Sequence, residues 1–412
     1  MRSTDINKFT VFLERYWIPL GVLFLFCGMF LHPSRGSFKT LVGIGVILPA
    51  LLHLLLHWNT AVKSYFSPAV FIFYAALLYV AASVLWGDGD LISYARRVAK
   101  ITLVGYAVYI LYSRQRALFY RLSVVAVIVA AIICLFWLVD YYCFLNHPYN
   151  ARFLSGRVDS FEIYQKGYYG GFYNPLLLGH VLVFLFVLGV NLIVVVELRL
   201  SHWLRASLVV SCLVLFVMLI LSQARLSLIL AILVVIFWAW HRLRWKSIYI
   251  FIFMAAVIQL FLYFYGDFLL GRGLSYRPEI WQQSWAMIQE SWLFGYGMGS
   301  ELKIAIVKNH DLSDTHNIYL AILYYSGFTG LLLVAVAIVL VVFDIWKHRQ
   351  FNFWFYSWFM LLCLGGMVDG GGLLARPGEH WFNLVLPAIF LLALSRAESR
   401  VKHNKDSLEF ST

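Results

Sequence analysis

Two arginines and one histidine stand where apolar stretches of the chain meet polar ones. Arg225 lies in LILSQARLSLILA, between two apolar runs that leave almost no loop to hold it. Arg277 immediately precedes a predicted helix, and His316 opens another apolar run in SDTHNIYLAILYY. A guanidinium can clamp a phosphate through two parallel hydrogen bonds, and a neutral imidazole can accept a proton near pH 7. The three residues predict one site that combines anion binding with proton transfer.

Each of these residues also has a simpler interpretation. Arg225 could extend its side chain to a lipid phosphate, and Arg277 could be a solvated loop charge. His316 could be a packed or capping residue at a helix start. The functional interpretation is favoured by the predicted placement of all three at one membrane face, because an ionisable group near membrane depth is costly.

The composition defines the elements that must position these residues. Of the 412 residues, 62% are hydrophobic and 13% are charged, with a mean hydropathy of +0.80. A soluble enzyme and a disordered chain are excluded by these values, and the long unbroken apolar runs do not fit a membrane β-barrel. The net charge of +12 indicates cytoplasmic loops that face anionic lipid, so no nucleic-acid partner is expected. The chain is expected to be an all-α polytopic protein with a single integral membrane domain, residues 1–412.

Segments of about 20 apolar residues predict roughly twelve transmembrane helices. They cover residues 17–32, 40–57, 68–86, 98–113, 119–146, 174–197, 203–222, 225–241, 247–267, 316–345, 352–370 and 381–396. All loops between them are short except 147–173 and 268–315, which are rich in Gly, Tyr and polar residues. Function is expected in these two loops and at the helix ends beside them.

The distribution of Lys and Arg predicts the orientation. More than half of them fall on the side of the two termini, so both termini are expected in the cytoplasm and both long loops on the opposite side. The group Arg96, Arg97 and Lys100 does not fit this orientation: either it lies at the interface and binds lipid phosphate, or the neighbouring spans are misplaced. Asp369 and Arg376 fall on the side of the long loops, where they could close the site or form an ion pair.

The loop 268–315 contains one predicted amphipathic helix, Pro278 to Trp292. It places Trp281 and other apolar residues at helical spacing, and proline suits its first turn. An anchor at the membrane surface is an equally good interpretation of this helix. Three alternating glycines follow in FGYGMGS, of which Gly297 is the central one, and they suit a close backbone approach.

Neither a metal nor a cofactor is expected. Asp88 and Asp90 in WGDGD could hold a divalent cation, but this tripeptide is far more common in turns, and the arginines already offer positive charge. The five cysteines are odd in number and show no CxxC spacing, so neither a disulfide framework nor a zinc site is indicated.

Several short motifs resemble the bacterial O-antigen ligase and polymerase superfamily, and O-antigen ligases most. The motifs are SxxR from Ser222 to Arg225, Arg277 with Trp281, the GYGxG turn, and THNIYL followed by GFTG. GFYNPLLLGH, which contains Asn174, also fits, so the resemblance covers about 170–345. Ser326 departs from the pattern, because many members carry an acidic residue at that place.

The resemblance implies a glycosyltransferase-C-like fold in the bacterial inner membrane with its active site on the periplasmic side. The implied reaction transfers an O-antigen glycan from undecaprenyl pyrophosphate to the lipid A core, with inversion and without a metal. Arg225 and Arg277 would bind the pyrophosphate, and His316 would serve the acceptor hydroxyl. Pyrophosphate or glycan contacts would come from both arginines and from Ser222, Asn317, Trp281, Gly297 and Asn174.

Three alternative functions remain open at this point. Within the superfamily, an O-antigen polymerase would use a second carrier-linked glycan as acceptor, and a protein O-oligosaccharyltransferase would use a protein. A flippase or transporter without catalysis would instead show charges near the middle of the membrane and related half-sequences.

The orientation can be tested by cysteine labelling. In a background without the native cysteines, a cysteine at Ser275 should react with a membrane-impermeant thiol reagent added from the periplasmic side. A cysteine at Ser247 should be protected, because it lies on the side of the termini. Labelling with the opposite sidedness would overturn the orientation.

Overall fold

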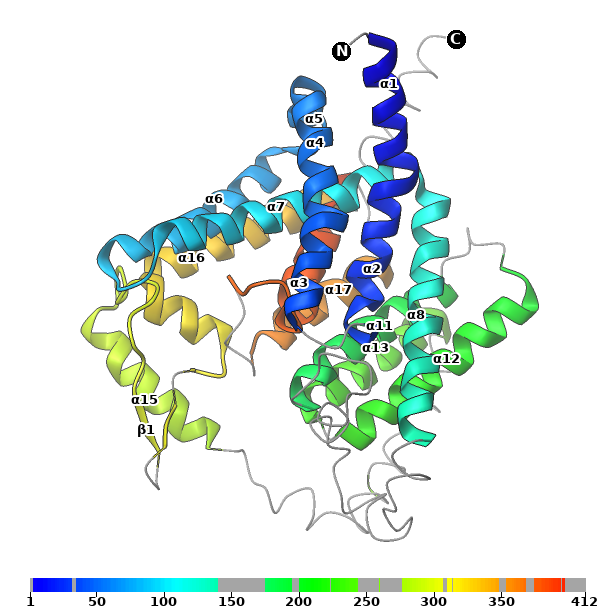
Figure 1. The fold of residues 1–412 in the computed structure, drawn as a ribbon. Helices are drawn as coiled ribbons and strands as arrows, with labels where there is room; N and C mark the ends of the chain where they lie inside the picture. Colours follow the sequence, from blue (N-terminus) through cyan, green and yellow to red (C-terminus); the bar gives the residue numbers. More distant parts are fainter. Residues whose placement is uncertain are drawn as a thin grey trace.

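The computed structural model describes most of the chain, and the fold is a bundle of helices with one small hairpin. The described residues are 3–31, 35–139, 175–194, 200–222, 224–243, 259, 276–306, 310–312, 314–347, 353–367, 374–393 and 395–396. The first described helix, residues 3–12, and the helix that contains Ser64 lie at one end of the bundle, at the top of Figure 1. Arg396, the last described residue, donates a hydrogen bond of 2.9 Å to the carbonyl of Ser64 and so lies at the same end. This end is called the end of the termini below, and the opposite end is called the distal end.

The described elements follow the order of the chain. They are α1 (Ser3–Phe12), η1 (Leu13–Trp17), α2 (Ile18–Leu31), α3 (Arg35–Val42), η2 (Gly43–Ile47), α4 (Leu48–Leu56), α5 (Trp58–Tyr65), α6 (Pro68–Ala82), η3 (Ser83–Trp86), α7 (Leu91–Arg114), α8 (Arg116–Val139), α11 (Pro175–Val194), α12 (His202–Ser222), α13 (Arg225–Leu243), α15 (Arg277–Glu290), β1 (Ile304–Ile306), β2 (His310–Leu312), α16 (Ile318–Lys347), α17 (Phe353–Gly365) and η6 (Trp381–Val385). The strands β1 and β2 pair antiparallel, a feature that the all-α prediction did not include.

Eight helical segments in the described part are long and apolar enough to cross a membrane. They are Asp5–Leu31, Gly36–Leu56, Pro68–Trp86, Arg116–Val139, Leu176–Val194, His202–Ser222, Arg225–Arg242 and Ile318–Lys347. The last two predicted spans correspond to the shorter apolar helices Phe353–Gly365 and Trp381–Ala393. The predicted span 98–113 lies within α7, whose first ten residues carry Arg96, Arg97 and Lys100. The predicted span 247–267 lies outside the described residues except for residue 259. The helical membrane class is thus confirmed, whereas the number twelve stays a prediction.

The centre of the bundle is formed by α11. Of the residues in its apolar stretch within Leu176–Val194, 89% are buried. The helix packs against α8, α12, α13 and α17. Phe184 on α11 lies 5.0 Å from Trp358 on α17, measured between ring centroids. Asn191, buried on the same helix, donates a hydrogen bond of 2.7 Å to the hydroxyl of Ser357. Aromatic packing and one buried polar pair therefore fix α17 to the centre.

The predicted span 316–345 corresponds to the apolar segment Ile318–Lys347, but this segment is not one continuous helix. The helix α16 begins at Ile318 and is broken at Gly327, whose φ of 67° and ψ of −171° are not helical. This conformation is almost restricted to glycine, because a side chain would clash with the backbone. The break interrupts the hydrogen-bond ladder of a helix that crosses the membrane, so the freed groups need other partners.

The glycine turn of residues 295–299 and the residues just before it supply these partners. Two N–H groups of this region donate to carbonyls before the break, and two N–H groups after the break donate to carbonyls just before the turn. The four bonds are Tyr296 N–H to Tyr324 (2.8 Å), Gly297 N–H to Tyr325 (2.8 Å), Phe328 N–H to Trp292 (2.8 Å) and Thr329 N–H to Leu293 (3.2 Å). The loop and the broken helix therefore complete each other's backbone hydrogen bonds.

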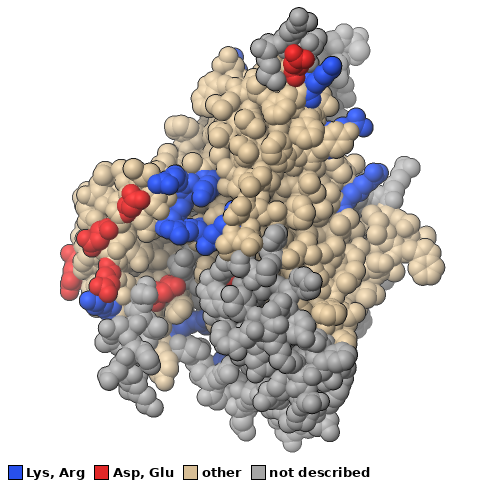
Figure 2. All heavy atoms as spheres, viewed as in Figure 1, with Lys and Arg blue, Asp and Glu red and all other residues tan. Residues whose placement is uncertain are grey.

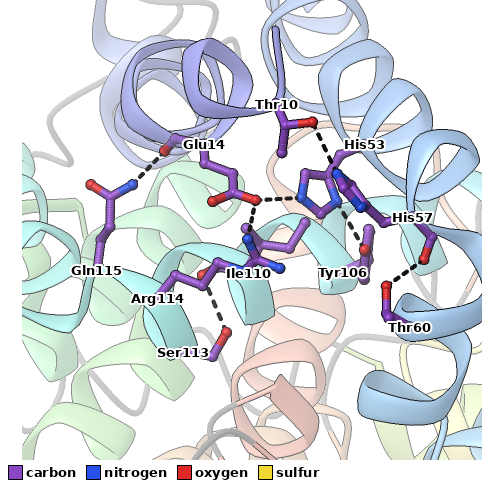
Figure 3. Close-up of polar contacts among 10 residues, drawn as sticks. All are labelled: Thr10, Glu14, His53, His57, Thr60, Tyr106, Ile110, Ser113, Arg114 and Gln115. Atoms are coloured by element: carbon purple, nitrogen blue, oxygen red, sulfur yellow. Dashed lines mark hydrogen bonds and ion pairs between the residues drawn. The ribbon is translucent and has the colours of Figure 1, made fainter. Parts of the chain in front are cut away.

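A polar network joins the helices at the end of the termini, and no motif in the sequence indicated it (Figure 3). The carboxylate of Glu14 accepts hydrogen bonds from Arg114 and, at 2.7 Å, from Nε2 of His53. Nδ1 of His53 lies 3.0 Å from the hydroxyl of Tyr106, and Gln115 donates to the carbonyl of Glu14. The network ties η1 to α4 and α7. A polar group that is buried with its hydrogen bonds satisfied specifies the packing of such helices.

The break in α16 generates a prediction about stability. A Cβ added at Gly327 would lie 2.3 Å from the carbonyl oxygen of Leu293. Gly327→Ala should therefore lower the free energy of unfolding by at least roughly 1–3 kcal/mol, the usual cost of such a backbone conformation in a residue with a side chain. The measurement is thermal unfolding of the purified protein in detergent, followed by tryptophan fluorescence.

Gly43→Ala is the matched control, because no atom lies within 4 Å of a Cβ placed there and Gly43 belongs to a helical segment. Alanine at that position should leave the stability unchanged or raise it slightly. Equal effects of the two substitutions would contradict the role given to Gly327.

Candidate functional site

The three residues that the sequence singled out all lie at helix starts. Arg225 is the first residue of α13, Arg277 is the first residue of α15, and His316 precedes α16 by two residues. All three side chains are partly exposed. The start of a helix presents free N–H groups and the positive end of the helix dipole, so these positions suit an anion.

Helix packing brings the starts of α13 and α16 toward the same end of the bundle. Phe237 on α13 stacks on Phe353 at the start of α17, with ring centroids 5.9 Å apart. The helices α13 and α17 run in opposite directions, because Gly179 near the start of α11 packs on the start of α13, whereas Asn191 near the end of α11 bonds to the start of α17. Just beyond the other end of α17, the carbonyl of Gly366 accepts a hydrogen bond of 2.8 Å from the N–H of Ile318. Arg225 and the His316 segment therefore lie toward the same end of these helices.

A helix, α15, lies where the amphipathic helix was predicted, and its packing couples Arg277 to α16. Ile280 and Ile288 are buried in a small cluster that also contains Tyr324 of α16. Proline follows Arg277 in the first turn, as expected, and Tyr276 before the helix provides no side-chain cap. Since no side chain at that position occupies the first N–H groups, they can contribute to an anion site.

The two tryptophans in the second half of this region point outward. Trp285 and Trp292 are 51% and 58% exposed, which fits contact with a membrane surface.

Burial raises the pKa of Tyr296 to about 12, and the carboxylate of Glu290 at 2.9 Å adds to the rise. Tyr296 therefore stays a hydroxyl at physiological pH and continues to donate to its partners on α15.

The backbone at His316 is unusual and orients its ring. Its φ is 49°, in the left-handed region, and its N–H donates to Oδ1 of Asp314 at 3.0 Å. The second carboxylate oxygen, Oδ2, lies 4.0 Å from Nδ1 of the imidazole. The contacts described for this ring involve Nδ1, so Nε2 is the nitrogen available to a reacting hydroxyl. A carboxylate beside one ring nitrogen, with the other left for the substrate, is an arrangement that suits a general base.

Asn317 and Gly297 have structural roles in the described contacts. Oδ1 of Asn317 caps α16, accepting from the N–H groups of Tyr319 at 2.9 Å and Leu320 at 3.2 Å. Gly297 has a φ of +86°, and a Cβ there would lie 2.4 Å from the backbone nitrogen of Gly87. The glycine thus allows the turn to pack against the loop before α7. Substrate contacts by Asn317 and Gly297 stay predictions.

The remaining predicted contacts differ in their placement. Trp281 packs against the cluster around Ile280, and its indole nitrogen is buried without a partner in the described part of the chain. Ser222 is buried, and its hydroxyl donates to the carbonyl of Leu219 at 3.0 Å. Asn174 lies outside the described residues, so its role stays a prediction.

The proposed acid pair before α7 includes a helix cap. Both carboxylate oxygens of Asp90 accept hydrogen bonds of 3.1 Å, one from the N–H of Ile92 and one from that of Ser93. This contact fits the interpretation of DGD as a turn. In the described residues, no group of three or more His, Cys, Asp or Glu side chains is arranged to hold a metal ion.

Tertiary structure brings together two histidines that no spacing in the sequence indicated. His180 on α11 and His380 in the segment 374–380 have ring centroids 6.1 Å apart. Gly179, beside His180, packs so closely on α13 that a Cβ there would lie 2.4 Å from that of Ala224. His180 is therefore close to the start of α13, and His380 lies beside His180. The motif NPLLLGH contained His180, but His380 is more than 190 residues away in the chain.

Comparison with known proteins places these residues in context. Residues 210–335 match the family described as O-antigen ligase. This segment contains both arginines, His316 and every other predicted contact except Asn174. The chain is also 27% identical over 405 residues to an O-antigen ligase of Pseudomonas aeruginosa, an alignment that covers 95% of this chain and 94% of that protein. The resemblance to O-antigen ligases is thus confirmed, in a family match over residues 210–335 and in a relative aligned over nearly the whole chain.

Proposed function

We propose that this protein is an O-antigen ligase, which transfers a glycan from undecaprenyl pyrophosphate to a terminal sugar of the lipid A core. The observation that supports the proposal is that Arg225 and the His316 segment stand at helix starts toward the same end of α17, within the residues that match the ligase family. A cationic anchor and a base at one end of the helices are what the transfer of a pyrophosphate-linked sugar requires. The protein acts in the bacterial inner membrane, with this site facing the periplasm and both termini in the cytoplasm.

In the proposed reaction the acceptor hydroxyl oxygen attacks the anomeric carbon of the glycan. The bond between that carbon and the pyrophosphate oxygen breaks, and its electron pair leaves with the pyrophosphate. Nε2 of His316 takes the hydroxyl proton, while Arg225 and Arg277 stabilise the departing negative charge. A single displacement inverts the configuration at the anomeric carbon. The guanidinium charges make a metal unnecessary.

Reconstitution tests the function directly. The purified full-length protein is mixed with the carrier-linked glycan and lipid A core, and the products are separated by electrophoresis. Formation of the glycan–lipid A conjugate is expected, also in the presence of EDTA. Elongation of the carrier-linked glycan would identify a polymerase, and a glycosylated protein acceptor would identify a protein O-oligosaccharyltransferase; either result, or no transfer, would refute the ligase proposal.

The arginines can be tested by a substitution that keeps their charge. Arg225→Lys and Arg277→Lys each replace a planar fork by a point charge, so we expect transfer to fall by about 10²-fold or more while the protein still inserts and purifies normally. Arg205→Lys, on an exposed residue of α12, is the matched control and should keep full activity. Full activity in either test variant would exclude a clamp on the pyrophosphate by that residue.

The backbone at His316 determines which substitution tests it best. Asparagine tolerates the left-handed conformation but accepts no proton at pH 7. His316→Asn should therefore lower turnover by roughly 10²- to 10⁴-fold without loss of stability or donor binding. His202→Ala, on an exposed residue of α12, is the control. If His316→Asn kept normal turnover, the histidine would only orient the acceptor by a hydrogen bond.

A further inference from the structure

Three cations lie close together in the first ten residues of α7. They are Arg96, Arg97 and Lys100, so that like charges stand three and four residues apart on one helix. Such pairs repel each other and destabilise an isolated helix. In the proposed orientation, with both termini in the cytoplasm, these cations also lie on the periplasmic side, where short loops usually carry few cations. The repulsion between the cations and their placement on this side would both be relieved by a bound anion.

Arg97 is held in a position that suits a ligand. Its Nη1 donates a hydrogen bond of 3.1 Å to the carbonyl oxygen of Leu374, and its guanidinium carbon lies 4.2 Å from the ring centre of Tyr94. Its Nε is buried, and no described residue accepts a hydrogen bond from it. A buried guanidinium N–H without an acceptor is costly, so an anionic acceptor would satisfy it. The ring of Tyr94 also fixes the guanidinium plane.

A second segment brings a fourth cation to the same place. Leu374, which accepts the bond from Arg97, lies two residues before the exposed Arg376. Figure 2 shows a group of Lys and Arg side chains on this face, at the place where α7 and the segment 374–380 face each other in Figure 1. Acidic side chains gather separately, at the left edge of that view.

The same segment connects these cations with the candidate active site. Six residues after Leu374 comes His380, whose ring lies 6.1 Å from that of His180 near the start of α13. The basic group is therefore joined to the surroundings of Arg225 by one short piece of chain. An anion bound at α7 would lie beside the segment that leads to His380.

We propose that Arg96, Arg97, Lys100 and Arg376 bind the phosphate groups of the glycolipid acceptor. This inference rests on the proposed function, in which Arg225 and Arg277 hold the donor pyrophosphate and the lipid A core is the second phosphate-bearing substrate. Arg97 favours this assignment over a bilayer headgroup, because its guanidinium contacts the segment 374–380 and is partly buried instead of pointing into lipid.

Binding of the acceptor to the full-length protein in detergent tests this site. The variant is Arg96→Gln with Lys100→Gln, which keeps two good helix formers on a partly exposed surface. Compared with the unchanged protein, it should bind phosphorylated lipid A core at least roughly tenfold more weakly. Dephosphorylated lipid A core should bind equally to the double variant and to the unchanged protein. Arg97→Lys, which keeps the charge but loses the planar fork, should also weaken the binding of the phosphorylated ligand.

The control is Lys303→Gln, which removes one charge from an exposed residue near the distal end and should leave acceptor binding unchanged. Transfer assays should show a raised KM for the acceptor and an unchanged KM for the donor. Three results would each overturn the proposal: unchanged acceptor binding in the double variant, weakened binding of the donor but not of the acceptor, or equal competition by phosphatidylglycerol added to the same detergent micelles. Because binding is measured without turnover, loss of the phosphate-dependent binding is distinguishable from failure of the ligase reaction itself.

Discussion

The arrangement of the distal end depends on the exchange of backbone hydrogen bonds between the broken helix α16 and the glycine turn that precedes it. A helix cannot be interrupted at membrane depth unless the freed N–H and C=O groups find partners in the protein. Here the turn supplies them on both sides of Gly327. The same turn packs against the loop before α7, where the N–H of Gly89 donates to the carbonyl of Met298 at 3.1 Å. One loop therefore connects α15, α16 and the start of α7.

This connection explains how residues far apart in the chain can serve one reaction. The first half of α16 carries the His316 segment at its start and is fixed to α17 by the bond between Ile318 and Gly366. The helix α17 is in turn fixed to the central α11 and packs along α13, which begins with Arg225. Rigid helices thus position the proposed base and one proposed anion anchor, and α15 with Arg277 is attached through the small apolar cluster.

Cations at this end occur in two groups with different surroundings. Arg225 and Arg277 stand at helix starts, where the helix dipole adds to their charge. The group on α7 is instead shaped by one buried guanidinium that contacts the carbonyl of Leu374. Two separate positive regions fit the chemistry of a transfer in which both the donor and the acceptor are membrane lipids that bear phosphate.

The sequence by itself determined the helical membrane class, the amphipathic helix at Arg277 and the helix starts around Arg225 and His316, because hydropathy, proline placement and boundary residues are local signals. Only the tertiary structure decided the break at Gly327, the meeting of Arg97 with Leu374 and the network around Glu14. In each of these features a local defect or a buried polar group is satisfied by a distant part of the chain. Periodicity shows which face of a helix is apolar, but it does not show which distant partner will satisfy a freed carbonyl or a buried charge.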